Sequence, residues 1–117
     1  MNEQFQKTLD FANYRQTLAV QRRELKERAS ANLTYGFNGG LFKIDQTLLN
    51  FVHMLITIDR TENIVLLDAN ENPVLIEDLV SFKEEIFDRY FSATNEYYEE
   101  YKQLKSSRSV EKLISYE

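Results

Sequence analysis

Residues Leu75 to Lys105 read LIEDLVSFKEEIFDRYFSATNEYYEEYKQLK, and this stretch decides the fold. Apolar residues recur along it at spacings of three and four, which keeps them on one face of an α-helix. These residues are Leu79, Phe82, Ile86, Tyr90, Ala93, Tyr97, Tyr101 and Leu104. A second apolar stripe lies beside the first: Val80, Phe87, Phe91 and Tyr98. The pattern predicts one long helix that packs against two neighbours.

A second long helix is predicted from Asn2 to Ser30, because neither proline nor glycine interrupts this segment. Its apolar residues form stripes on nearly opposite sides. One stripe holds Phe5, Leu9, Ala12, Ala19 and Val20, and the other holds Phe11, Tyr14, Leu18, Leu25 and Ala29. A helix with two apolar stripes needs two partners. We expect one to be the helix at 75–105, running antiparallel, and the other to be the centre of the chain or a second copy.

Five basic residues gather in the second half of the first helix: Arg15, Arg22, Arg23, Lys26 and Arg28. In an antiparallel pair they would lie near Glu84, Glu85 and Asp88, and such ion pairs bias the register of two helices. The alternatives are a solvated face and a patch that contacts nucleic-acid phosphates. The net charge of −5 opposes nucleic-acid binding by the whole surface.

The three glycines of the chain fall between residues 36 and 40. Asn38-Gly39 stands between two apolar runs, and both residues tolerate a positive φ, so the segment predicts a β-hairpin with strands at 33–37 and 40–44. A phosphate-binding glycine loop is not expected, because neither the Walker nor the dinucleotide spacing is present.

Asp45 is expected to cap a helix from Gln46 to about Ile58. This helix is apolar most of the way round, which predicts a buried central helix. It contains His53, the only histidine of the chain. Without a carboxylate or a second histidine at ligand spacing, a lone histidine is more often a packed residue than a catalyst or a metal ligand.

A second hairpin is predicted from strands at 64–67 and 73–76, and the two hairpins would join into one small sheet. The turn between its strands contains Asp68, Asn70 and Asn72, which match the first ligand positions of a calcium loop. The rest of that motif is missing, because Pro73 stands where glycine is needed and Leu79 where glutamate is needed. We therefore expect no calcium site.

The composition is that of an ordinary globular protein, with 28% charged and 43% hydrophobic residues in a chain of 117. We predict a single α+β domain over 1–105, predominantly helical, in which two long antiparallel helices flank a buried helix and two short hairpins. A mobile basic tail is expected at 106–117, because the segment from Ser106 to Ser109 interrupts the helical spacing. The absence of cysteine excludes disulfides and thiolate metal sites.

The chain carries no recognisable export or membrane signal. Its first residues, MNEQFQKTLDF, lack an apolar core, and no stretch approaches the roughly 18 uninterrupted apolar residues of a membrane helix. We expect a cytoplasmic protein without a membrane partner. The abundance of Asn, Lys, Tyr and Phe hints at an AT-rich genome and at a phage protein, located in the host cytoplasm or in the virion.

No catalytic, metal or cofactor motif stands out, so we expect neither enzyme activity nor a cofactor. The favoured function is that of a homodimeric structural, assembly or adaptor protein that acts through its long helices, with other protein partners also compatible. The expected interface residues are Phe11, Tyr14, Leu18 and Leu25. The alternatives are a nucleic-acid accessory protein that uses the bases between Arg15 and Arg28, and a small ligand-binding protein or enzyme with its site near His53.

Overall fold

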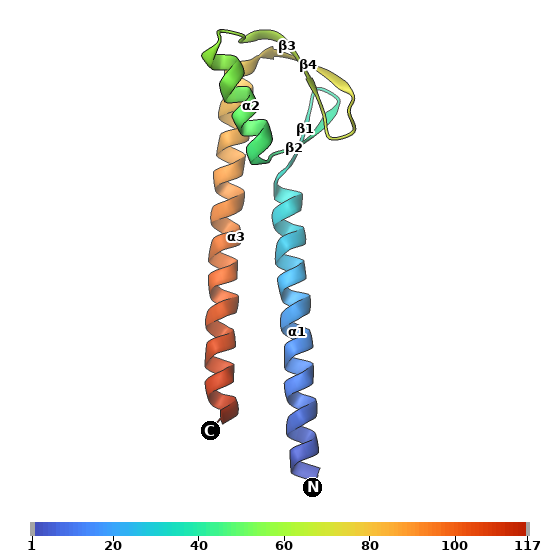
Figure 1. The fold of residues 1–117 in the computed structure, drawn as a ribbon, viewed down its shortest axis with the longest axis vertical. Coiled ribbons are helices and arrows are strands. Elements are labelled where there is room, and N and C mark those ends of the chain that lie inside the picture. Colours follow the sequence, from blue (N-terminus) through green and yellow to red (C-terminus); the bar gives the residue numbers. More distant parts are fainter. Residues whose placement is uncertain (1, 117) are drawn as a thin grey trace. The chain divides into compact units, whose positions relative to one another are not determined.

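The computed structural model describes the backbone of residues 2–116 and the side chains of residues 3–106. The elements in chain order are α1 (Asn2–Asn32), β1 (Thr34–Phe37), β2 (Gly40–Lys43), α2 (Gln46–Thr57), β3 (Glu62–Leu67), β4 (Pro73–Asp78) and α3 (Leu79–Tyr116) (Figure 1). The protein is therefore α+β and predominantly helical, which confirms the predicted fold class.

The chain divides into two compact units. The helical unit consists of residues 1–28 and 96–117, and the mixed unit consists of residues 29–95. The mixed unit holds both hairpins, α2, the last residues of α1 and the first part of α3.

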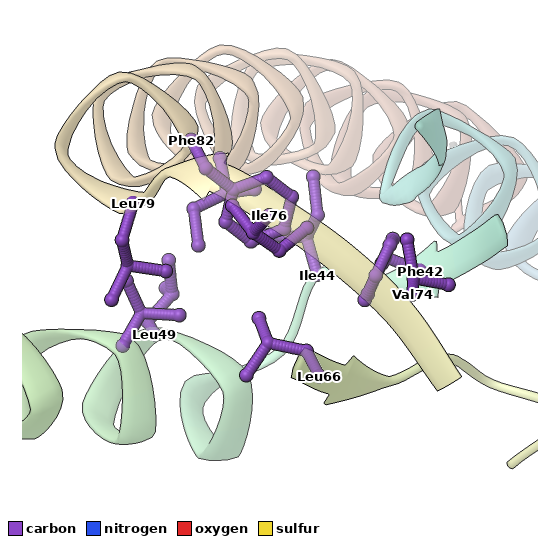
Figure 2. Packing of buried hydrophobic residues seen from close by; sticks show 10 residues of the cluster. Phe42, Ile44, Leu49, Leu66, Val74, Ile76, Leu79 and Phe82 are labelled. Atoms are coloured by element: carbon purple, nitrogen blue, oxygen red, sulfur yellow. The ribbon is translucent and has the colours of Figure 1, made fainter. Parts of the chain in front are cut away.

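The hydrophobic core of the mixed unit receives one face from each of five elements, as Figure 2 shows. Its buried residues are Phe42, Ile44, Leu49, Val52, Leu66, Val74, Ile76, Leu79, Phe82 and Ile86. In each strand they alternate with outward-facing residues, and in the two helices they recur at three and four, as the periods of strand and helix require. Burial of this size is the main stabilising contribution to the unit.

The first hairpin forms at the predicted turn. Phe37 pairs with Gly40, which leaves Asn38 and Gly39 as a two-residue loop. Their φ values are 48° and 81°, the left-handed conformation that a type I′ turn requires at both positions. The second hairpin is also confirmed, with both strands two residues longer than predicted.

The two hairpins form separate two-stranded sheets, so the expected single sheet is not formed. They are joined instead at Leu41. Its N–H donates to Asp68 Oδ2 at 3.0 Å, and its carbonyl accepts from the N–H of Ala69 at 2.7 Å. The close approach depends on Gly40, since an added Cβ would lie 2.4 Å from Val74 Cγ2.

Helix α2 begins after the predicted cap, because Asp45 Oδ1 accepts from the N–H of Leu48 at 2.8 Å. The predicted burial of this helix holds for one face only. Leu49 and Val52 are buried, whereas the side chains of Phe51 and Met54 are 45% and 49% exposed. The reason is that the strands and α3 cover a single side of α2 within the mixed unit.

Helix α3 begins at Leu79 rather than at Leu75, because residues 73–78 pair with β3 as strand β4. Asp78 ends the strand and caps the helix, since its carboxylate accepts from the N–H of Val80 and the N–H and hydroxyl of Ser81. The helix runs to Tyr116, past the predicted end at Lys105. The single domain at 1–105 and the mobility of 106–117 stay predictions, and side chains after Ser106 lie outside the described residues.

Candidate functional site

Within the helical unit, α1 and α3 run antiparallel, as predicted (Figure 1). An open groove of about 610 Å³ lies between them. Three of the four expected interface residues, Tyr14, Leu18 and Leu25, line this groove, opposite Gln103 and Leu104 of α3. The groove thus lies where this apolar stripe of α1, which we call the seam, faces α3 of the same chain.

The fourth expected interface residue, Phe11, continues this seam toward the N-terminus and has a side chain that is 52% exposed. Leu18, at 9% exposure, is the one buried apolar residue among residues 3–28 and 96–106 of the helical unit. Large apolar side chains of this unit are exposed in the same ranges: Phe5, Leu9, Phe11, Tyr98 and Tyr101. The described part of the helical unit therefore has very little core of its own.

The charge pairing expected between the long helices was wrong for Arg28. Arg28 Nη1 lies 2.6 Å from Glu100 Oε2, whereas Glu84, Glu85 and Asp88 belong to the mixed unit. The prediction failed because it assumed that the basic end of α1 pairs with the start of α3. That part of α3 packs its buried face, which includes Phe82 and Ile86, into the core of the mixed unit.

The predicted nucleic-acid patch is exposed along α1. Arg15 lies over the ring of Phe11 at 5.8 Å, Arg23 lies 3.9 Å from Glu27, and Arg28 pairs with Glu100. Three of its five bases therefore have partners within the helical unit. Binding of a nucleic acid by this patch stays a prediction.

A second groove, of about 560 Å³, lies within the mixed unit, and we call it the acidic groove. One wall is the end of the first hairpin, with Tyr35, Phe37 and Asn38. The other wall is formed by the end of β4 and the first two turns of α3: Leu75, Glu77, Asp78, Ser81, Phe82 and Glu85. Asn38 joins the walls, because its Nδ2 donates to the carbonyl of Leu75 at 2.9 Å.

Aromatic rings line the apolar part of the acidic groove. The ring centroids of Phe37 and Phe82 are 5.3 Å apart, and that of Tyr35 lies 5.8 Å from Phe37 and 6.2 Å from Phe82. Phe82 is buried, whereas Tyr35 and Phe37 are half-buried, so parts of their rings face the groove. These ring contacts join the two walls and stabilise the arrangement of the three side chains.

Every charged residue that lines the acidic groove is acidic: Glu77, Asp78 and Glu85. The Asp78 carboxylate has a lowered pKa, because it accepts hydrogen bonds from the Ser81 hydroxyl and from the N–H groups of Ser81 and Val80. It therefore stays ionised and neutralises the positive end of the α3 dipole. The mixed unit as a whole carries ten acids and four bases, a net charge of −6.

The acidic groove was not predicted from the sequence. The sequence did contain a signal. Tyr35 and Phe37 lie two residues apart, on one face of a strand, and Asp78 and Glu85 lie seven residues apart, on one face of a helix. What the sequence did not reveal is that the hairpin turn lies against β4, a contact made through the Asn38 side chain.

His53 lies on the exposed side of α2 and lines neither groove. Among the residues that the structure describes, no group of three or more His, Asp or Glu side chains could hold a metal ion. Asp68, considered above for calcium, uses both carboxylate oxygens to accept the N–H groups of Leu41, Asn70 and Asn72. Its role in the fold is therefore structural.

No protein-family model, no curated protein and no solved structure matches this chain. In the described part of the chain, no helix combines the length and the apolar character needed to cross a membrane.

Proposed function

We propose that the protein acts without enzymatic chemistry, as a homodimeric structural, assembly or adaptor protein whose long helices form the interface between copies. One observation carries the proposal: the described helical unit buries Leu18 alone among its apolar residues, while large apolar side chains stay exposed. Exposed apolar patches of this kind mark interaction surfaces.

A second copy is the partner that best completes this unit. Two antiparallel helices leave a groove lined by Tyr14, Leu18, Leu25 and Leu104. A second helical pair packed over the groove would form a four-helix bundle with a shared core. Such an interface would include Phe11, which continues the same seam. We place this protein in the cytoplasm, or in a virion if it is phage-encoded.

The test is the molar mass of the protein in solution, measured by sedimentation over a wide range of concentrations. We expect the wild type to be a dimer and the Phe11→Glu variant to dissociate. Burial of a Phe side chain contributes about 1.5–3 kcal/mol to the free energy of association, and a two-fold interface buries Phe11 of both copies. The dissociation constant should rise at least about tenfold. Phe11 is half exposed in the single chain, so the variant should keep its helix content in circular dichroism.

The matched control is Thr8→Glu, which adds the same charge at an exposed polar position of α1. This variant should remain a dimer. A wild-type protein that is monomeric at every concentration would contradict the proposal. If Phe5→Glu with Leu9→Glu dissociates the dimer and Phe11→Glu does not, the interface lies on the opposite stripe of α1.

A further inference from the structure

We propose that the acidic groove binds an arginine-bearing segment of a partner protein. This surface lies entirely within the mixed unit, and the inference is independent of self-association through the long helices.

The chain provides its own example of cation binding at this surface. The guanidinium of Arg89 lies 4.2 Å from the ring centroid of Tyr35, and its Nε lies 2.7 Å from Glu85 Oε1. Tyr35 and Glu85 both line the groove. An aromatic face beside a carboxylate is the environment that a guanidinium favours, because its plane stacks on the ring while its N–H groups donate to the acid.

The charge of the groove selects a cation over an anion. A helix N-terminus can attract phosphate or carboxylate groups, but here the Asp78 carboxylate already occupies the first N–H groups of α3. Glu77 adds further negative charge, and the negative charge of Glu85 is shared with Arg89, the base that pairs with it beside the groove. A segment with a positive side chain therefore meets complementary charge, both in the groove and in the net charge of the mixed unit.

The groove also suits an apolar or aliphatic stem beside the charged group. The half-buried ring of Phe37 provides apolar surface, and the exposed side chain of Leu75 also lines the groove. Arginine places three methylene groups between its backbone and its guanidinium, and such stems pack along apolar surfaces while the charge reaches a carboxylate. Both parts of an arginine side chain therefore find a complementary surface.

The experiment is a titration with the peptide acetyl-Gly-Arg-Gly-Arg-Gly-amide, followed by amide chemical shifts of the full chain. We expect shifts that concentrate at Tyr35, Phe37, Glu77 and Ser81. The peptide with citrulline in place of arginine keeps the shape and loses the charge, and it should not bind. Equal binding of both peptides would overturn the proposal.

Two pairs of variants distinguish binding in the groove from nonspecific attraction to the negative charge of the mixed unit. Glu85→Gln should weaken binding by about threefold, as expected for a partly exposed charge pair, whereas Glu84→Gln, outside the groove, should leave it unchanged. Arg89→Gln should strengthen binding, because it frees Tyr35 and Glu85, and Lys83→Gln is its charge-matched control. Equal effects within either pair would overturn the proposal.

A third peptide tests a second copy of the chain as the occupant. It reproduces residues 19–28, AVQRRELKER, the basic segment of α1. We expect it to bind no more tightly than the arginine probe. If it occupies the groove at least ten times more tightly, the occupant is a second copy rather than a different partner, and the proposal is overturned.

Discussion

Asp68 is a charged residue at 8% exposure, and three backbone N–H groups compensate for its burial. One of them belongs to Leu41, so this carboxylate connects the two hairpins. Asp68→Asn should lower the melting temperature by several degrees. Because both oxygens of Asp68 accept hydrogen bonds, an amide must turn its NH₂ group toward at least one N–H donor. Asp88→Asn, at an exposed position of α3, is the control and should melt like the wild type.

The same carboxylate makes stability depend on pH. The N–H groups of Leu41, Asn72 and Asn70 lower the pKa of Asp68 below its ordinary value of 3.8. Its contribution is therefore complete above this value and is lost as pH falls through the lower pKa of the folded state. Denaturant unfolding from about pH 5 down to about pH 3 should show wild-type stability falling more steeply than that of Asp68→Asn. Parallel curves would mean that Asp68 does not titrate in this way.

At the scale of the element, the first hairpin depends on its two-residue turn. Replacement of Asn38-Gly39 by Val-Val should destabilise the protein by about 2–4 kcal/mol, because each β-branched residue is strained at positive φ. The change also removes the hydrogen bond from Asn38 to Leu75. Chemical denaturation would measure the effect, with Gly36→Val as the control, since an added Cβ at Gly36 meets no atom closer than 4.0 Å. An unchanged stability of the turn variant would contradict this account of the hairpin.

At the scale of the whole molecule, the two units differ in how much core they bury. The mixed unit contains a cluster of ten buried apolar residues, whereas Leu18 alone is buried in the described helical unit. Backbone amides without a packed core exchange through low-energy local openings. In hydrogen exchange at low concentration, amides of residues 3–28 and 96–106 should exchange much faster than those of β2, α2 and β4.

The same hydrogen-exchange measurement also tests the proposed dimer. If copies associate through the helical unit, raising the protein concentration should slow exchange at residues 3–28 and 96–106 and leave the mixed unit unchanged, because burial in an interface protects only the segments that form it. Strong protection of both units at every concentration would contradict this difference between them.

Features that depend on neighbouring residues could be read from the sequence alone. The turn at Asn38-Gly39, the cap at Asp45 and the two long helices follow from φ preferences, local hydrogen bonds and apolar spacing. Each of these signals lies within a few residues of the structure it produces. That proximity is why the α+β fold class and the order of the elements could be predicted.

Features that depend on contacts between distant segments were decided by the tertiary structure. Residues 75–78 were predicted as the start of the long helix, although 75 and 76 also belong to the predicted strand at 73–76. All four form a strand because they pair with β3. Helix α2 is apolar nearly all round, yet it buries one face because the unit covers only one side. The acidic groove lies between segments that are distant in the sequence, joined by the hydrogen bond from Asn38 to Leu75, 37 residues further along the chain. Apolar periodicity predicts which faces favour burial, but only tertiary contacts decide which of these faces are covered.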